Sequence, residues 1–147
     1  MKNIVIFAFA FFIITSFSGC TKNYQSAEAA SICDEANDKK NVRLSGYLTD
    51  GVTVMCSNYG GRLDCGFKLL QDPSEKDGIT VNILQGSSAN EVEKLERGYK
   101  KEDIKIRDNS GNLVAPSDKV NVSGTMAVGP KSKDGQACFL KVDKIEK

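Results

Sequence analysis

Apolar residues follow two different patterns along the chain. Residues 4–17 form one continuous apolar run, which the short basic start Met1-Lys2-Asn3 precedes. Beyond this run, apolar and polar residues alternate in short stretches, as expected for β-strands with one buried face. The alternation predicts strands at residues 42–49, 52–59, 62–71, 79–84, 120–128 and 138–145, and a small hairpin at 104–114. Asp50-Gly51 is either a bend within one strand or a separate turn, and the pattern does not decide between them.

Residues 52–70 predict a β-hairpin with a defined register. Gly60-Gly61 is a two-residue turn signal, because both glycines can adopt the positive φ that such turns need. Counting outward from this turn places Tyr59 opposite Arg62 and Cys56 opposite Cys65. The cysteines then form a non-hydrogen-bonded pair with Cα atoms about 4.5 Å apart, within reach of a disulfide. We expect both sulfurs to lie in the core, on the face that also carries Val52, Val54, Leu63, Phe67 and Leu69.

Two short helices are expected between the strands. Residues 26–37 are rich in alanine and predict a short N-terminal helix. Ser88-Ala89-Asn90-Glu91 has the pattern of a capping box, and Val92, Leu95 and Tyr99 follow at helical spacing. The sequence therefore predicts a second helix that begins near Ser88 and ends near Gly98.

A glycine motif occurs twice. Residues 42–46 read Val-x-Leu-Ser-Gly and residues 120–124 read Val-x-Val-Ser-Gly. Gly46 interrupts its strand and predicts a bend or bulge there. Residues 129–136 are polar and predict a loop before the last strand.

The first 19 residues have the composition of a bacterial export signal. Their apolar run is shorter than the roughly 20 residues that span a bilayer. Phe17-Ser18-Gly19-Cys20 resembles the bacterial lipobox, although Leu is usual where Phe17 stands. The resemblance implies cleavage before Cys20, acylation of Cys20 by fatty acids such as palmitate, and a membrane-anchored lipoprotein of the cell envelope facing the periplasm or the surface. The alternatives are an ordinary secretory signal and an uncleaved transmembrane anchor. Residues 1–19 would then be a signal peptide, 20–25 a lipid-anchored tether and 26–147 a single domain.

Four further cysteines form an even set: Cys33, Cys56, Cys65 and Cys138. Exported proteins fold under oxidising conditions, where such sets form disulfides. The hairpin register selects Cys56–Cys65 and leaves Cys33–Cys138. A zinc site with four cysteine ligands would need closely spaced pairs, which this sequence lacks, so no metal is predicted.

Charge and residue types make several functions less favoured. Cleavage removes only Lys2 and leaves 19 basic against 19 acidic residues, without the basic excess of nucleic-acid-binding proteins. The chain contains no histidine, which is the commonest general base and transition-metal ligand. With four cysteines bridged and Cys20 acylated, no thiol nucleophile remains. We therefore expect a protein that is not an enzyme and has no cofactor.

The predicted order is strand, strand, strand, helix, strand, strand. This is the order of the OB-fold, a five-stranded, partly open Greek-key barrel whose helix lies between strands 3 and 4. The chain resembles the small bacterial OB-fold domains of the tRNA-anticodon-binding-like group over residues 40–146. The matching positions are Val42, Leu44, Gly46, residues 117–124 and residues 138–145. The resemblance implies an all-β fold with one or two short helices. Residues 100–116 are an insertion relative to the family pattern.

OB-folds bind ligands on the face of strands 2–3 and with the loops that join strands 1–2 and 4–5. In this chain the first loop carries Tyr59 and Arg62, and the second carries Lys131 and Lys133. Tyr59 and Arg62 either stack on a base or sugar, or pack only on each other across the strands. The favoured hypothesis is a non-enzymatic envelope module that binds a protein or glycan. The alternatives are a surface protein that binds single-stranded nucleic acid and, less favoured, a hydrolase.

Overall fold

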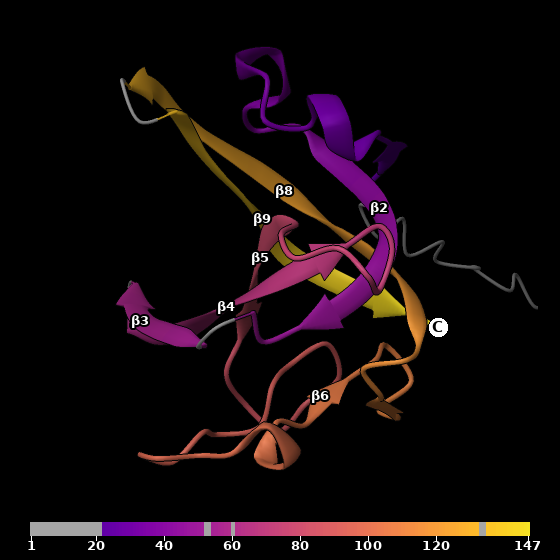
Figure 1. Cartoon of the computed structure of the whole chain (residues 1–147), viewed down its shortest axis with the longest axis vertical. Helices are drawn as coiled ribbons and strands as arrows, with labels where there is room; N and C mark the ends of the chain where they lie inside the picture. Colours follow the sequence, from indigo (N-terminus) through magenta and orange to yellow (C-terminus); the bar gives the residue numbers. More distant parts are fainter. Residues whose placement is uncertain (1–21, 52–53, 60, 133–134) are drawn as a thin grey trace, which may run out of the picture.

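Strands make up most of the computed structural model, which describes residues 22–147 apart from 52–53, 60 and 133–134 (Figure 1). The strands are β1 (Gln25–Ser26), β2 (Asn41–Thr49), β3 (Met55–Tyr59), β4 (Arg62–Leu70), β5 (Ile79–Leu84), β6 (Ile106–Arg107), β7 (Leu113–Val114), β8 (Lys119–Ser132) and β9 (Gly135–Glu146). The helical segments are the 3-10 turns η1 (Ala29–Ser31), η2 (Glu35–Asn37) and η3 (Lys101–Asp103). No helix in the described part of the chain is long and apolar enough to cross a membrane. The prediction of a mainly β protein is confirmed.

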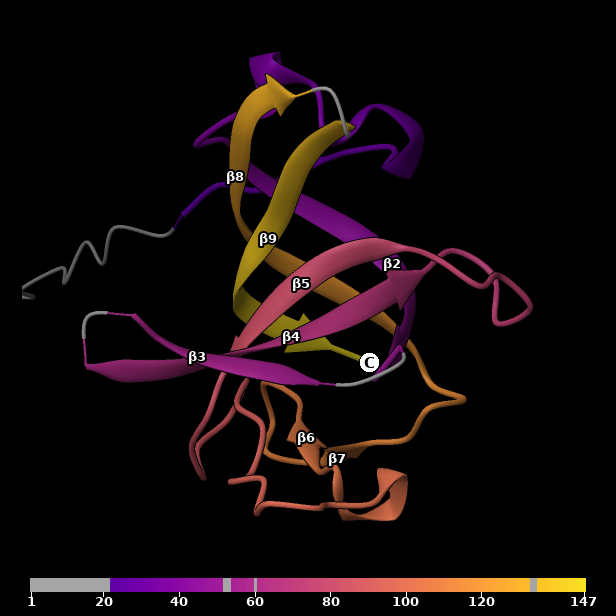
Figure 2. The same ribbon diagram turned by 60° about the vertical axis from the view of Figure 1, so that its left-hand side comes forward.

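The long strands pair into a closed ring. The hydrogen-bonded order is β2-β8-β9-β5-β4, and Tyr47–Thr49 of β2 pair with Lys68–Leu70 of β4 to complete it. Neighbouring strands within the ring are antiparallel except β5 and β9, which are parallel. β1 extends the sheet along β2, and β3 extends it along β4. The β6–β7 pair forms a separate small sheet, which lies below the ring in Figure 2.

Alternating side chains fill the inside of the ring. In β5, for example, Ile79, Val81 and Ile83 are buried, whereas Thr80 and Asn82 are partly exposed. The largest fully buried side chains come from every long strand and from the segments that close the ring: Phe67, Ile32, Leu44, Leu69, Ile83, Met126, Leu140, Ile145, Val81, Val92, Val120 and Val122. Their burial is the main stabilising contribution expected for this domain.

The two copies of the glycine motif pair with each other. Val42 lies opposite Gly124, and Gly46 lies opposite Val120, with no break in register through β2. The predicted irregularity at Gly46 is therefore not a bulge. A Cβ at Gly46 would collide with the carbonyl oxygen of Leu70, so glycine is needed where β2 passes from β8 to β4. The bulge lies instead at the second glycine, where the β8–β9 register shifts between Ser123 and Gly124.

The predicted register of the β3–β4 hairpin is confirmed. Tyr59 pairs with Arg62 and Cys56 with Cys65, and Gly61 has a φ of +86°. The expectation that both sulfurs lie in the core is wrong for one of them, because Cys65 is fully buried and Cys56 is exposed. Leu63 is also 38% exposed. The tip of this hairpin extends past the ring, so its inward-facing residues have little to pack against.

Both predicted α-helices are absent from the described residues. Residues 26–37 form β1 and the turns η1 and η2, and Ile32 between the turns is buried in the core. The amide of Asn37 donates to the carbonyl oxygens of Ser31 and Ile32, which closes this segment on itself.

The helix predicted from Ser88 is replaced by an extended segment. The Ser88 N–H donates to Glu91 Oε2 at 2.8 Å, as in a capping box, but Asn90 has a φ of +63°. Val92 then forms bridges with Gln85 and Ile106 and is completely buried. The requirement to cover one end of the ring has therefore outweighed the local helical pattern.

Two further predictions concern the second half of the chain. The loop predicted at residues 129–136 is wrong, because β8 and β9 continue toward their turn and Lys131 pairs with Gln136. The small hairpin predicted at 104–114 is confirmed as β6–β7, where Asn109 and Gly111 lie in the turn. It is not part of the ring.

Candidate functional site

Two hairpins project beyond the ring in different directions, the β3–β4 hairpin and the distal part of the β8–β9 hairpin (Figure 2). β5 lies between the two hairpins in the sheet, because it pairs with β4 on one side and with β9 on the other. Figure 2 shows β9, β5, β4 and β3 side by side. The outer surface of these strands is therefore bounded by a hairpin on each side.

The register defines which residues point outward on this surface. Met55 lies opposite Gly66, Gly66 opposite Asn82, and Asn82 opposite Lys141, so these residues form one row across four strands. Directly opposed residues share a face of a sheet. A second row contains Lys68 opposite Thr80, with Phe139 beside Thr80. We call this surface the hairpin face: Met55, Gly66, Lys68, Thr80, Asn82, Phe139 and Lys141.

Large apolar side chains are exposed on the hairpin face. Met55 is 78% exposed and Phe139 is 37% exposed. Gly66 lies between them on β4. A Cβ placed at Gly66 would lie 3.6 Å from Asn82 Oδ1 and 4.0 Å from Thr80 Cγ2. Aromatic residues and methionine are enriched in protein interfaces. Met55 and Phe139 thus provide apolar contacts on either side of the polar residues Asn82 and Thr80.

The charged residues of the hairpin face are Lys68 and Lys141, and Asp77 beside the face pairs with Lys68. Lys68 Nζ lies 2.9 Å from Asp77 Oδ1 and donates to the Gly78 carbonyl oxygen at 3.2 Å. The hydrogen bond from Lys68 lowers the pKa of Asp77. Lys141 is exposed and forms no ion pair with the described residues. Next to the face, Asp64 has a buried oxygen, Oδ1, without a hydrogen-bond partner in the described part of the chain.

The residues proposed from sequence as ligand contacts do not form one cluster. Arg62 is at the tip of the β3–β4 hairpin, with Nη2 3.6 Å from Glu91 Oε1. Lys131 is exposed near the tip of the β8–β9 hairpin, which projects separately. Tyr59 pairs with Arg62 through its backbone, and its side chain lies outside the described residues, as do Lys133 and the lipidation candidate Cys20.

The cysteines lie in the two predicted pairs at disulfide-bonding distance. Cys56 and Cys65 have Cα atoms 4.0 Å apart and link β3 to β4. Cys33 and Cys138 have Cα atoms 5.5 Å apart and link the segment between η1 and η2 to β9. Each projecting hairpin thus carries one bridge.

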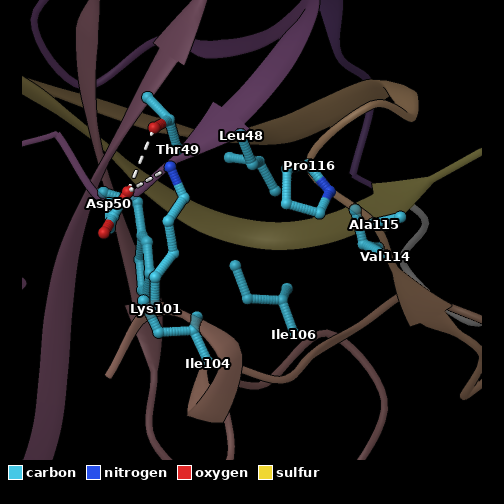
Figure 3. Close-up of a pocket in the computed structure, with 10 residues that line it drawn as sticks. Leu48, Thr49, Asp50, Lys101, Ile104, Ile106, Val114, Ala115 and Pro116 are labelled. Atoms are coloured by element: carbon cyan, nitrogen blue, oxygen red, sulfur yellow. Dashed lines mark hydrogen bonds and ion pairs between the residues drawn. The ribbon is translucent and has the colours of Figure 1, made fainter. Parts of the chain in front are cut away.

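A small cavity lies at the end of the ring, under the segment that contains η3 and β6 (Figure 3). Leu48, Phe67, Ile104 and Ile106 line it, and its volume is about 40 Å³. Lys101 Nζ approaches Asp50 Oδ1 at 3.3 Å beside it. Ligand pockets usually enclose about 300–1,000 Å³, so this cavity has room for water but not for an organic ligand.

Other chemistry has little support in the described residues. They contain no group of three or more His, Cys, Asp or Glu side chains that could hold a metal ion. No protein-family model, curated protein or solved structure matches this chain. The hairpin face is therefore the best-supported candidate site on structural grounds alone.

The alternation of the last strand is a local sequence signal for this site. Leu140 and Val142 of this strand are buried. The same alternation places Phe139 and Lys141 outward, where the structure has them. Their proximity to Gly66 and Met55, however, depends on the parallel β5–β9 pairing, which no local pattern indicates.

Proposed function

We propose that this chain is a lipid-anchored binding module of the bacterial cell envelope, with OB-fold architecture, and that it holds a protein or glycan partner on the hairpin face. The strand order supports the architecture. β2, β4 and β5 pair in sequence, and β8 returns after a long connection to lie beside β2, which is the spatial order of a Greek key. β9 then closes the ring between β8 and β5.

The observation that carries the binding proposal is the exposed Phe139 on a surface bounded by two hairpins. If β4 and β5 are strands 2 and 3 of an OB-fold, the hairpin face is the surface that such folds use for ligands. An exposed aromatic ring beside Thr80 and Asn82 can stack on a sugar or pack against a peptide. Asp77 balances the charge of Lys68, so the face lacks the basic excess that favours a polyanion.

Anchoring to the membrane rests on the sequence Phe17-Ser18-Gly19-Cys20 and on the two cysteine pairs. Disulfides of this kind are typical of exported proteins. Acylation with more than one chain would provide the two lipid signals that stable membrane attachment requires. Metabolic labelling with palmitate tests this step, since the label should be lost in the Cys20→Ala variant.

The binding proposal is tested with lipidated protein solubilised from the envelope in mild detergent. Blue native electrophoresis should show the wild-type chain in a complex larger than the chain with its detergent. Phe139→Asp should release the chain from this complex, because a carboxylate replaces an apolar contact of the hairpin face.

Leu113→Asp is the matched control. Leu113 is 49% exposed and belongs to the separate β6–β7 sheet, outside the hairpin face. This variant should keep the complex. Equal migration of the wild type, Phe139→Asp and Leu113→Asp would show that the hairpin face does not bind the partner.

A further inference from the structure

The residues just after the proposed acylation site are attached to the body of the domain. Lys22 Nζ lies 2.9 Å from Asp143 Oδ2, and the Tyr24 hydroxyl donates to the same oxygen at 3.3 Å. Gln25 and Ser26 then pair with β2 as β1, and the Ala27 N–H donates to the Arg43 carbonyl oxygen at 3.1 Å. We call residues 22–27 the strap.

The strap spans several strands of the ring. Its first contact, Asp143, is on β9, whereas its last contacts are on β2, with β8 between them. Two strand spacings are about 10 Å, so the strap crosses the outer surface of the sheet. Burial and the negative charge of Asp143 both raise the pKa of Tyr24, which agrees with a side chain lying against the protein.

A β-bulge presents the acceptor of the strap. In the β8–β9 ladder, Gly124 pairs with Val142 and Ser123 with Lys144, so Asp143 is the extra residue of β9. Bulges often redirect a side chain in this way. A Cβ at Gly124 would collide with the Lys141 carbonyl oxygen, so this close approach requires glycine. The second copy of the glycine motif thus has a specific role in placing Asp143.

Only Thr21 separates Cys20 from the strap. Two residue steps span at most about 7 Å, so an acylated Cys20 must lie close to Lys22. We infer that the strap holds the domain in one orientation on the membrane, with the surface around Lys22, Tyr24 and Asp143 against the lipid headgroups. This inference rests on the acylation of Cys20 in the proposed function.

The orientation places the hairpin face close to the membrane surface. Phe139, Lys141 and Asp143 are successive outward positions on β9, all exposed. Phe139 is therefore about 13 Å along the strand from the strap contact. The partner held on the hairpin face is accordingly one that lies at the membrane surface.

Tryptophan fluorescence can test this orientation because the chain contains no tryptophan. Lys141→Trp and Leu113→Trp each introduce a single reporter, the first near the strap and the second on the β6–β7 sheet. The full lipidated chain is reconstituted in phosphatidylethanolamine–phosphatidylglycerol vesicles that contain a lipid with a nitroxide quencher on its headgroup. The reporter at position 141 should lose more fluorescence than the reporter at position 113.

A longer tether provides the matched control. Inserting about eight Gly and Ser residues between Thr21 and Lys22 extends the average reach to roughly 17 Å and releases the orientation while leaving the fold intact. The difference between the two reporters should then disappear. Equal quenching without the insertion, or a difference that the insertion does not change, would overturn the inference about the strap. Failure of the chain to float with the vesicles would instead refute the acylation of Cys20.

Discussion

The two hairpins that bound the hairpin face are stabilised in different ways. In the β8–β9 hairpin, strands of 14 and 12 residues pair over most of their length, and both belong to the ring. In the β3–β4 hairpin, β3 has five residues, no charged side chain and pairing with β4 alone among the described strands. Short edge strands of this kind are prone to local opening.

Each hairpin has a disulfide, and the two disulfides close loops of very different length. Cys33–Cys138 joins residues 105 positions apart and ties the N-terminal segment to β9. Cys56–Cys65 joins residues nine positions apart within one hairpin. We therefore expect the Cys33–Cys138 bridge to stabilise the whole domain and the Cys56–Cys65 bridge mainly to keep β3 paired with β4. Four sets of substitutions test this difference, in order of decreasing expected loss of stability.

The first change removes the long-range bridge with Cys33→Ser and Cys138→Ser. In the chain-entropy model, a loop of 105 residues contributes about 4.7 kcal/mol to the free energy of unfolding. We therefore expect a large fall in the melting temperature and in the denaturant midpoint, measured by circular dichroism. A smaller fall in stability than that caused by removing the Cys56–Cys65 bridge would contradict this expectation.

The second change removes the local bridge with Cys56→Ser and Cys65→Ser. The same model gives about 2.6 kcal/mol for a loop of nine residues. Hydrogen exchange should show faster exchange in Met55–Tyr59 than in the wild type, with little change in β8 and β9. Uniformly faster exchange throughout the domain would show that this bridge is not local in its effect.

The same difference between local and long-range interactions explains what the sequence could predict. The β3–β4 register follows from Gly60-Gly61 and nearby residues, and β5 was predicted with its observed bounds. The helix expected at Ser88 failed because Val92 pairs with Ile106 and covers the ring. The loop expected at 129–136 failed because polar residues can also extend a hairpin beyond the core. Only the order of strands in space brings Phe139 beside Thr80.

The strap was not predictable for a similar reason. Residues 20–25 were expected to be a tether, and nothing nearby in the sequence indicates a partner for Lys22. Asp143 becomes that partner through a bulge that depends on Gly124. The glycine itself was visible as the second copy of a motif, but its physical role differs from that of Gly46 in the first copy.

The third change compares one glycine from each hairpin. Gly124→Ala in β8 places a methyl group against the Lys141 carbonyl oxygen and should destabilise the domain by about 1–3 kcal/mol. Gly66→Ala in β4 meets its nearest neighbour, Asn82 Oδ1, at the ordinary distance of 3.6 Å and should leave stability nearly unchanged. Chemical denaturation measures both, and similar losses would contradict the roles given to these glycines.

The fourth change concerns acid and the end of β9. Hydrogen bonding from Lys144 and the charges of Lys144 and Arg43 lower the pKa of Glu146 below its ordinary 4.5, against the opposing effect of burial. The unfolded chain therefore binds a proton at Glu146 more readily than the folded chain. The stabilisation is present above about pH 4.5 and is lost as the pH falls through the lower folded value.

Glu146→Gln should make the fall in stability below this pH shallower. The difference should be at most about 1 kcal/mol, because the ion pairs are partly exposed. Urea denaturation at a series of pH values from neutral to acidic provides the measurement. An unchanged slope in the variant would show that Glu146 does not contribute to acid sensitivity.

Cross-linking in the living cell with a photo-reactive phenylalanine analogue tests directly whether the hairpin face binds the partner. The analogue at position 139 lies on the hairpin face, and the analogue at position 113 lies on the separate β6–β7 sheet. If the hairpin face binds the partner, irradiation should give a discrete cross-linked product from position 139 and little from position 113. No discrete product at position 139, or the same product in equal yield from both positions, would contradict the assignment of the binding site to this face.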